Sequence, residues 1–276
     1  MDNRSIMKQD ETSIVKATED GIDELVRGGK LQIPPDYAVG NALRSAWYQI
    51  KLMKDHTNRP ITQVCSESSI TRALFTMSIL GLNPAKTQCY FIAYGNELKC
   101  QPSYLGNIAI AKRVNPEIVD IFAEVVHEGD EFEYEIRIGK KIIVRHIQKP
   151  ENLKNPIQCV YAYAYDESEK QIYAEIMTFD EIKTSWKKSK VEPVNKDGSL
   201  KPGTPHSDFT TEMAKRTVIN RLCKHIISTS NDQAVIEAYE KTEMNETEVA
   251  VESAKEQLKA PMNVDMPKEQ GEEDDF

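Results

Sequence analysis

The sequence predicts an α+β protein, in which a small antiparallel sheet with a hairpin is flanked by helices. Apolar residues recur with the period of a helix up to Gly81 and again after Thr178. Between residues 89 and 177, short runs rich in β-branched and aromatic residues are separated by glycine-containing turns, which is typical of strands. Helices on both sides of an antiparallel sheet define the α+β class.

The N-terminal part of the chain is expected to be helical. Residues 1–33 are expected to form an arm that contacts other protomers in an oligomer. Pro34-Pro35-Asp36 then interrupts the chain and offers an N-cap. Gly81 suits the left-handed conformation that ends a helix. The helices expected here cover about 11–27, 37–53 and 66–80.

The sheet is expected in the middle of the chain. Residues 89–101 predict a hairpin that turns at Gly95-Asn96. Ser103 then provides a cap for a helix that runs through Arg113. Most of residues 118–177 predicts strands. Further turns are expected at Gly129-Asp130 and Gly139-Lys140.

Helices return in the C-terminal part. The expected elements are a helix over 179–188, a long loop over 189–207, a basic helix over 209–227 and another helix over 231–250. Beyond about residue 255 the composition predicts disorder. The predicted organisation is thus an N-terminal arm (1–33), a core (34–230), and a C-terminal helix with an acidic tail (231–276).

Charge is distributed unevenly along the chain. The formal net charge is −9, and the segment from Thr242 to Phe276 holds 11 acidic and 3 basic residues. The segment from Glu181 to Lys224 holds 10 basic and 5 acidic residues. A basic surface is therefore compatible with an acidic protein.

Several classes of protein are disfavoured. The five cysteines include no CxxC pair, which indicates free thiols in a reducing, cytoplasmic compartment. No apolar run is long enough to span a membrane. The phosphate-binding motif of P-loop ATPases is missing, and the histidines show no metal-ligand spacing. Two alternatives stay open: a metal-dependent nuclease that uses Glu131, Glu133 or Glu135, and an oligomeric scaffold that binds no DNA.

The basic helix over 209–227 is expected to bury one apolar face and to expose a cationic face to water. Arg216, Asn220, Arg221 and Lys224 are expected to point outward. Lys215 lies on the apolar side, so it either extends past the core to water or stands at the rim of a groove beside a phosphate. Basic residues near 185–190 and 86–113 add to this surface. Trp186 is either a core residue or a platform for base stacking, and Phe91 is expected in the core.

Two blocks of sequence resemble the RecT family of phage and prophage single-strand annealing proteins. The first block combines Gly81-Leu82-Asn83-Pro84, Tyr94-Gly95-Asn96 and Ser103-Tyr104-Leu105-Gly106. The second combines Pro205-His206 with Glu212-Met213-Ala214-Lys215-Arg216-Thr217 and the downstream Arg221-Leu222-Cys223-Lys224, with one shift: the basic residue before the threonine is Arg216.

The resemblance implies an oligomeric protein, helical or ring-shaped, that binds single-stranded DNA and anneals complementary strands in phage recombination. It implies no catalysis and no cofactor: no ATP, and Mg²⁺ at most as a counterion. The implied partners are single-stranded DNA, annealed duplex and further protomers. The acidic tail is a separate element with three open interpretations: it recruits a partner such as a paired exonuclease or a host single-strand-binding protein, it competes with DNA for the basic groove, or it is an inert solubilising segment. The candidate DNA-binding residues are Lys86, Gln101, Tyr104, Lys112, Arg113, Trp186, Lys187, Lys188, Lys190, His206, Lys215, Arg216, Arg221 and Lys224.

Overall fold

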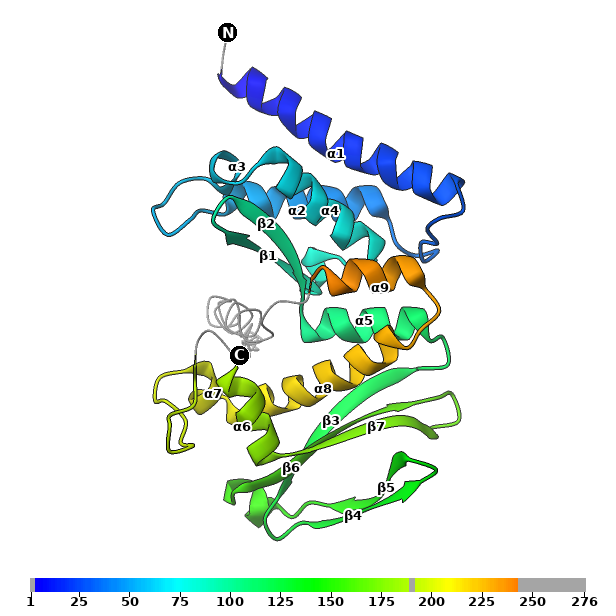
Figure 1. The fold of residues 1–276 in the computed structure, drawn as a ribbon, viewed down its shortest axis with the longest axis vertical. Helices are drawn as coiled ribbons and strands as arrows, with labels where there is room; N and C mark the ends of the chain where they lie inside the picture. The colour runs from blue at the N-terminus through cyan, green and yellow to red at the C-terminus, as the bar shows by residue number, and fades with distance from the viewer. Residues whose placement is uncertain (1–2, 189–191, 243–276) are drawn as a thin grey trace, which may run out of the picture.

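The computed structural model describes residues 3–188 and 192–242, with side chains from Ser13 onward (Figure 1). It confirms the predicted α+β class. Among the described residues, helices surround antiparallel strands, which form separate sheets of two, three and two strands. The molecule is elongated (Figure 1). One hydrophobic cluster contains residues from the first described helix to the last, so both ends of the molecule share a core.

The upper lobe in Figure 1 is a layer of helices packed on the β1–β2 hairpin. The first helix begins earlier than expected, at Asn3, and within the expected span Ile14, Thr18 and Ile22 are buried where α1 packs on α2 and α4. The elements of this lobe are α1 (Asn3–Arg27), α2 (Val39–Leu52), α3 (Ile61–Val64), α4 (Glu67–Ile79), the 3₁₀-helix η1 (Pro84–Lys86), β1 (Cys89–Tyr94) and β2 (Glu97–Pro102).

The lower lobe is built on a three-stranded sheet with strand order β3-β6-β7. The β4–β5 hairpin lies below it (Figure 1), next to β7. The Gln171 side chain on β7 accepts a hydrogen bond from the Ile143 N–H and donates one to the Lys141 carbonyl, both on β5. The elements here are β3 (Asp120–His127), β4 (Glu131–Arg137), β5 (Lys140–Ile147), the 3₁₀-helix η2 (Pro150–Lys154), β6 (Ile157–Tyr165), β7 (Gln171–Thr178), α6 (Phe179–Lys187) and α7 (Pro205–Asp208).

Three helices cross the middle of the molecule and join the lobes: α5 (Tyr104–Val114), α8 (Thr210–Ser228) and α9 (Gln233–Glu240). The basic helix predicted over 209–227 is confirmed as α8. The helix predicted over 231–250 is shorter where it is described, because α9 ends at Glu240; residues from 243 onward lie outside the described part.

The start of α5 is fixed by a close approach to the preceding chain. Ser103 accepts a hydrogen bond from the Gly106 N–H at 3.1 Å, and its own hydroxyl donates to the Thr87 carbonyl at 2.7 Å. A Cβ at Gly106 would lie 2.0 Å from the Gln88 carbonyl oxygen. Only glycine fits at this position, which gives a physical reason for the last residue of the Ser103-Tyr104-Leu105-Gly106 motif.

The burial of α8 corrects one expectation. Val218, Ile219 and Leu222 are buried as predicted, but Arg216 and Asn220 are buried too, at 8% and 9% exposure. They face α5, which packs along the side of α8 that was predicted to meet water. The cationic face of α8 that is exposed to water is therefore narrower than predicted.

Candidate nucleic-acid interface

The two blocks of motif residues meet where α5 packs against α8. The Asn107 Nδ2 donates to the Asn220 Oδ1 at 2.9 Å, and both side chains are buried. One turn away on each helix, the Arg216 guanidinium lies 5.0 Å from the centre of the Tyr104 ring. This cation–π contact keeps both side chains in place. Residues 113 positions apart in sequence are thus joined where the two helices cross.

The crossing carries three exposed lysines on the side where α5 and α8 begin. Lys86 ends η1, next to the Thr87 carbonyl that binds Ser103, the cap of α5. Lys187 and Lys188 end α6, directly after Trp186, whose indole N–H donates to Thr217 on α8 at 2.8 Å. All three are exposed. Figure 1 shows the start of α5 and the start of α8 on the same side of the molecule. The candidate interface consists of Lys86, Tyr104, Lys187 and Lys188, and the buried Arg216 holds the Tyr104 ring from within.

Trp186 and His206 support this surface from below. Trp186 is 3% exposed, which confirms the core position and leaves no ring face for base stacking. His206 is 1% exposed, and its ring lies edge-on to Trp186 at 4.7 Å between centroids. Burial lowers the pKa of His206 to about 4. A neutral, buried imidazole packs α7 onto α6 rather than presenting a nitrogen to a base or sugar.

Other predicted cations of α8 turn toward the sheet. The Lys215 ammonium pairs with Glu124 on β3 at 2.8 Å, and its side chain is 23% exposed. Arg221 lies 3.6 Å from Glu175 on β7. Lys224 is exposed. Lys215 and Arg221 thus face carboxylates of the sheet and do not join the candidate interface.

The predicted cations of α5 lie at its opposite end. A rise of about 1.5 Å per residue puts Arg113 roughly 14 Å from Tyr104 along the helix. Lys112 pairs with Asp120 at 3.6 Å. Arg113 donates to the carbonyls of Ile79, at the end of α4, and Gln32, and lies 3.9 Å from Asp232.

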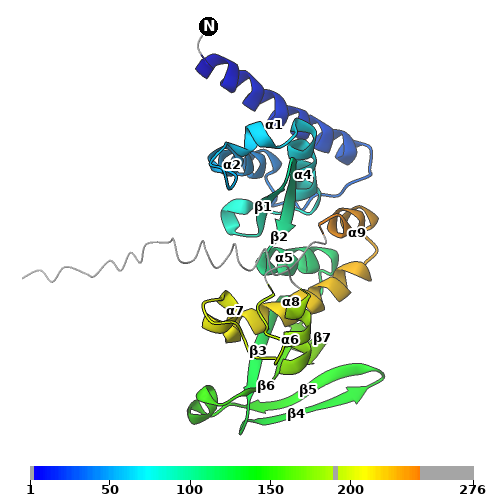
Figure 2. The ribbon, with the colours of Figure 1, turned by 60° about the vertical axis from the view of Figure 1, so that its left-hand side comes forward.

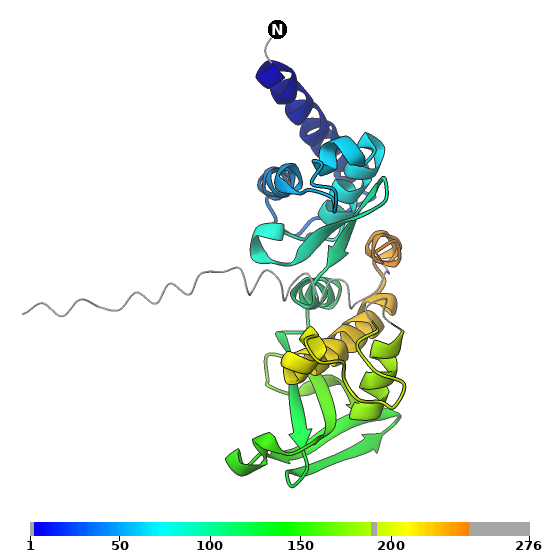
Figure 3. The same ribbon diagram turned by 90° about the vertical axis from the view of Figure 1, so that its left-hand side faces the viewer.

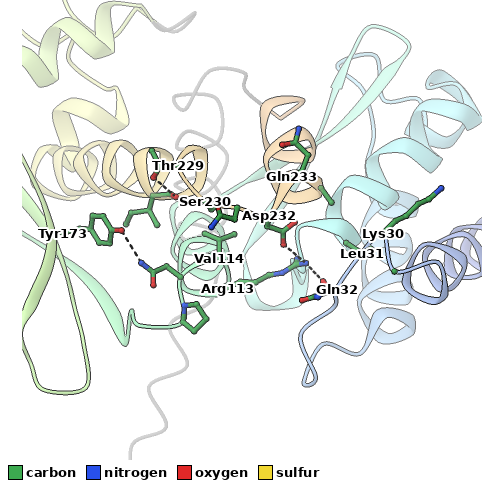
Figure 4. Close-up of a pocket in the computed structure, with 16 residues that line it drawn as sticks. Lys30, Leu31, Gln32, Arg113, Val114, Tyr173, Thr229, Ser230, Asp232 and Gln233 are labelled. Carbon is green, nitrogen blue, oxygen red and sulfur yellow. Dashed lines mark hydrogen bonds and ion pairs between the residues drawn. The ribbon is translucent and has the colours of Figure 1, made fainter.

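Arg113 thus stands in a pocket of about 610 Å³ between α5, α9 and the chain after α1 (Figure 4). With its side chain 12% exposed and three acceptors around it, the guanidinium holds the upper lobe to the helical layer. This location favours a structural role over contact with DNA.

The remaining candidates lie apart from the crossing. Gln101 is buried at 2% exposure, and Lys190 lies outside the described residues. Phe91 is in the core, as predicted. All five cysteines are free and buried, which agrees with the expectation of unpaired thiols.

The carboxylates considered for a nuclease do not gather into a metal site. Glu131 pairs with Arg145 at 3.1 Å, and Glu135 pairs with Arg137. In the part of the chain that is described, no three His, Cys, Asp or Glu side chains are grouped so that they could hold a metal ion. Nor does any described helix have the length and apolar character needed to cross a membrane.

The sequence did not single out Asn107, Asn220 or Thr217, although these residues fix α5 and α6 on α8. Only Asn107 offered a signal, as an amide beside Ile110 and Ala111, whereas Asn220 lies next to Arg216 and Lys224 on the side of the helix that was expected to meet water. Buried amides must be satisfied by a partner, so two such residues on separate helices indicate a contact.

Comparison with known proteins identifies a family for most of the chain. The model of the RecT family matches residues 40–256. Protein RecT of Escherichia coli (strain K12) is 31% identical over 172 residues, which cover 59% of each chain. The match thus spans somewhat less than two thirds of that relative's length.

The buried imidazole of His206 predicts a pH-dependent stability. Its pKa of about 4 in the folded chain lies below the ordinary value of 6.5, so the unfolded chain binds a proton more readily. The contribution to stability is complete above pH 6.5 and is lost as the pH falls toward 4. We expect urea unfolding to show a falling free energy between pH 7 and pH 5, and His206→Gln to flatten that slope. His225→Gln, an exposed position on α8, serves as the control, and an equal flattening there would contradict this assignment.

Proposed function

Because the chain belongs to the RecT family, we propose that it binds single-stranded DNA and anneals complementary strands in homologous recombination, as an oligomer and without ATP. The observation that carries the proposal is the packing of α5 on α8. It joins the two motif blocks and leaves Lys86, Lys187 and Lys188 exposed on one side. Lysine ammonium groups bind phosphate as point charges, with little dependence on base sequence.

The chemistry of the interface suits annealing. Its cations can hold the sugar-phosphate chain. Among the described aromatic side chains near the start of α5 and α8, Trp186 is buried, Tyr104 is partly exposed and Phe209 is 47% exposed. Bases that are not stacked into protein pockets remain accessible to a second strand. Few contacts per protomer then add along the DNA when protomers bind side by side.

Annealing is tested directly by adding two complementary oligonucleotides to the protein one after the other. We expect a protein-bound duplex to form in the absence of ATP and in the presence of EDTA, because the interface works through fixed cations. Labelled single strands incubated with Mg²⁺ provide the test of the nuclease alternative. Shortened strands there, or annealing that starts only on addition of nucleotide, would contradict the proposal.

The three exposed lysines predict a defined salt dependence. Each phosphate contact contributes about 0.7 to the slope of log affinity against log salt for a single strand. Lys187→Gln with Lys188→Gln should therefore weaken binding and lower that slope by roughly 1.4, without changing the unfolding temperature. Fluorescence anisotropy at a series of salt concentrations measures both quantities.

Two control variants distinguish the loss of a DNA contact from a change in net charge and from a loss of stability. Lys154→Gln with Lys170→Gln removes the same charge from exposed positions on the lower lobe and should leave the slope unchanged. Arg113→Ala should lower stability by about 3 kcal/mol, as expected for a lost network of charged hydrogen bonds. A salt slope that falls equally in the control pair would argue against the interface.

The acidic tail is proposed to compete with DNA for this interface and to recruit protein partners such as a paired exonuclease or a single-strand-binding protein. Residues 243–276, which lie outside the described residues, hold 11 acidic and 3 basic residues. We expect deletion of this segment to tighten DNA binding at low salt and to have little effect at high salt, where charges are screened. Equal affinities of the two proteins at low salt would rule out competition.

A further inference from the structure

Helix α2 presents one large aromatic side chain that the core does not use. Tyr48 is 67% exposed, and it lies on the face of α2 opposite Leu43 and Ile50, which are fully buried. Within the described part of the chain, the Tyr48 side chain makes no hydrogen bond, ion pair or ring contact. Its ring is therefore accessible to a partner, and the fold does not depend on it.

The exposed face of α2 lies beside the turn that leads into η1. The Tyr37 hydroxyl, just before α2, donates to the Leu82 carbonyl at 2.8 Å. The Gln49 amide on α2 donates to the Pro84 carbonyl, the first residue of η1, at 3.5 Å. Because Gln49 directly follows Tyr48 in the helix, η1 packs next to the accessible ring.

The other end of η1 is bonded to α5. Lys86 ends η1, and the Thr87 carbonyl that follows it accepts a hydrogen bond from Ser103, the cap of α5. Figure 2 shows α2 and α7 on the same side of the molecule, with α5 at a height between them. The surface of the candidate interface therefore continues from the start of α5, past Lys86, onto α2.

The charge of this segment suits a polyanion. Residues 37–66 hold four basic residues and one acidic residue, in a chain whose formal net charge is −9. The single carboxylate, on Asp55, is 8% exposed; it accepts hydrogen bonds from Arg59 at 2.8 Å and from the Thr57 hydroxyl at 2.7 Å. This carboxylate is thus satisfied within its own turn and does not repel a phosphate on the surface.

Exposed lysines accompany the accessible ring. Lys54 follows the end of α2, and Lys86 ends the neighbouring η1. Arg44 shares the space beside Gly40 with Glu19 of α1, so its charge is partly neutralised. Proteins that bind single strands without sequence preference combine cations that follow the phosphates with aromatic rings on which bases stack. The exposed face of α2 offers both.

Stacking on one exposed ring is compatible with annealing. A stacked base uses its π-face, so its Watson–Crick edge stays accessible to a second strand. Every base has such a face, and stacking therefore tolerates any sequence. An exposed ring on α2 orders a base without hiding it from a complementary strand.

We propose that Tyr48 stacks a base of single-stranded DNA, and that the strand runs from Lys187 and Lys188 across the start of α5 and past Lys86 onto α2. The inference rests on the proposed function, which supplies the ligand. It adds a contact in the upper lobe that is not electrostatic.

Tyr48→Ala tests the stacking contact. We expect an oligonucleotide to bind about 5- to 150-fold more weakly, the range for loss of one stacked base. The slope of log affinity against log salt should stay unchanged, because stacking releases no counterions. Tyr48→Phe should bind like the parent. Fluorescence anisotropy at a series of salt concentrations measures both quantities, and equal affinities of Tyr48→Ala and the parent would overturn the proposal.

Tyr134→Ala is the matched control, since it removes the same side chain elsewhere. Tyr134 is 47% exposed on β4, and Figure 3 shows the green β4–β5 hairpin near the end of the molecule opposite the blue α2. The control should bind like the parent. An equal loss of affinity there would refute the assignment to α2. Urea unfolding of Tyr48→Ala should match that of the parent, because the ring is exposed.

An abasic oligonucleotide separates base contacts from phosphate contacts. It keeps the sugar-phosphate chain and lacks the bases, so Tyr48→Ala and the parent should bind it with equal affinity. Weaker binding of the abasic chain by Tyr48→Ala would show that Tyr48 acts on the backbone of the DNA or on folding, and would rule out stacking.

Tyr48→Trp provides a direct reporter of stacking. The native Trp47 and Trp186 are 6% and 3% exposed, so the new indole is the accessible one. We expect its fluorescence to be quenched when the normal oligonucleotide binds and to be retained with the abasic chain. Unchanged fluorescence at saturation with the normal strand would contradict the proposal.

Two further outcomes distinguish this contact from other roles of α2 and from the proposed function. In the absence of DNA, light scattering should give Tyr48→Ala the same size as the parent; smaller oligomers would show that the face binds another protomer and would overturn the proposal. A parent that binds no oligonucleotide would refute both the function and the contact. A parent that binds DNA through Lys187 and Lys188, with no loss in Tyr48→Ala, would refute the stacking contact alone.

Discussion

The buried hydrogen bond between Asn107 and Asn220 is the constraint on which the arrangement of the site depends. Sliding α5 along α8 by one turn would leave two buried amides without partners, which is costly in a dry environment. The bond therefore fixes the register of the two helices. That register sets the Tyr104 ring against the Arg216 guanidinium. The uncharged hydrogen bond between the two buried asparagines thus positions the charged side chains of the candidate interface.

Features that depend on a few neighbouring residues could be predicted from the sequence. The cap at Ser103, the turn at Gly95-Asn96 and the helix end at Gly81 are all confirmed. Each follows from local chemistry: a hydroxyl that accepts an N–H, or a glycine that allows positive φ. The limits of α8 were predicted within one residue for the same reason, since apolar periodicity is a local property.

The surroundings of each side chain could not be predicted in this way. Periodicity assumes that a helix buries one stripe, but α8 packs against the sheet, α5 and α6, so Arg216 and Asn220 are buried against polar or aromatic partners. The number of charged residues in a segment likewise does not predict which of them face solvent. Lys215 and Arg113 count as two positive charges in the sequence, whereas in the fold one pairs with Glu124 and the other binds backbone carbonyls. Only the partner shows whether a cation faces solvent.

The small number of exposed cations at the crossing has a consequence for assembly. Three lysines supply a weak electrostatic attraction to a single strand, and salt screens it. Useful affinity then requires that neighbouring protomers bind the same strand, because each added contact benefits from the high local concentration of the next.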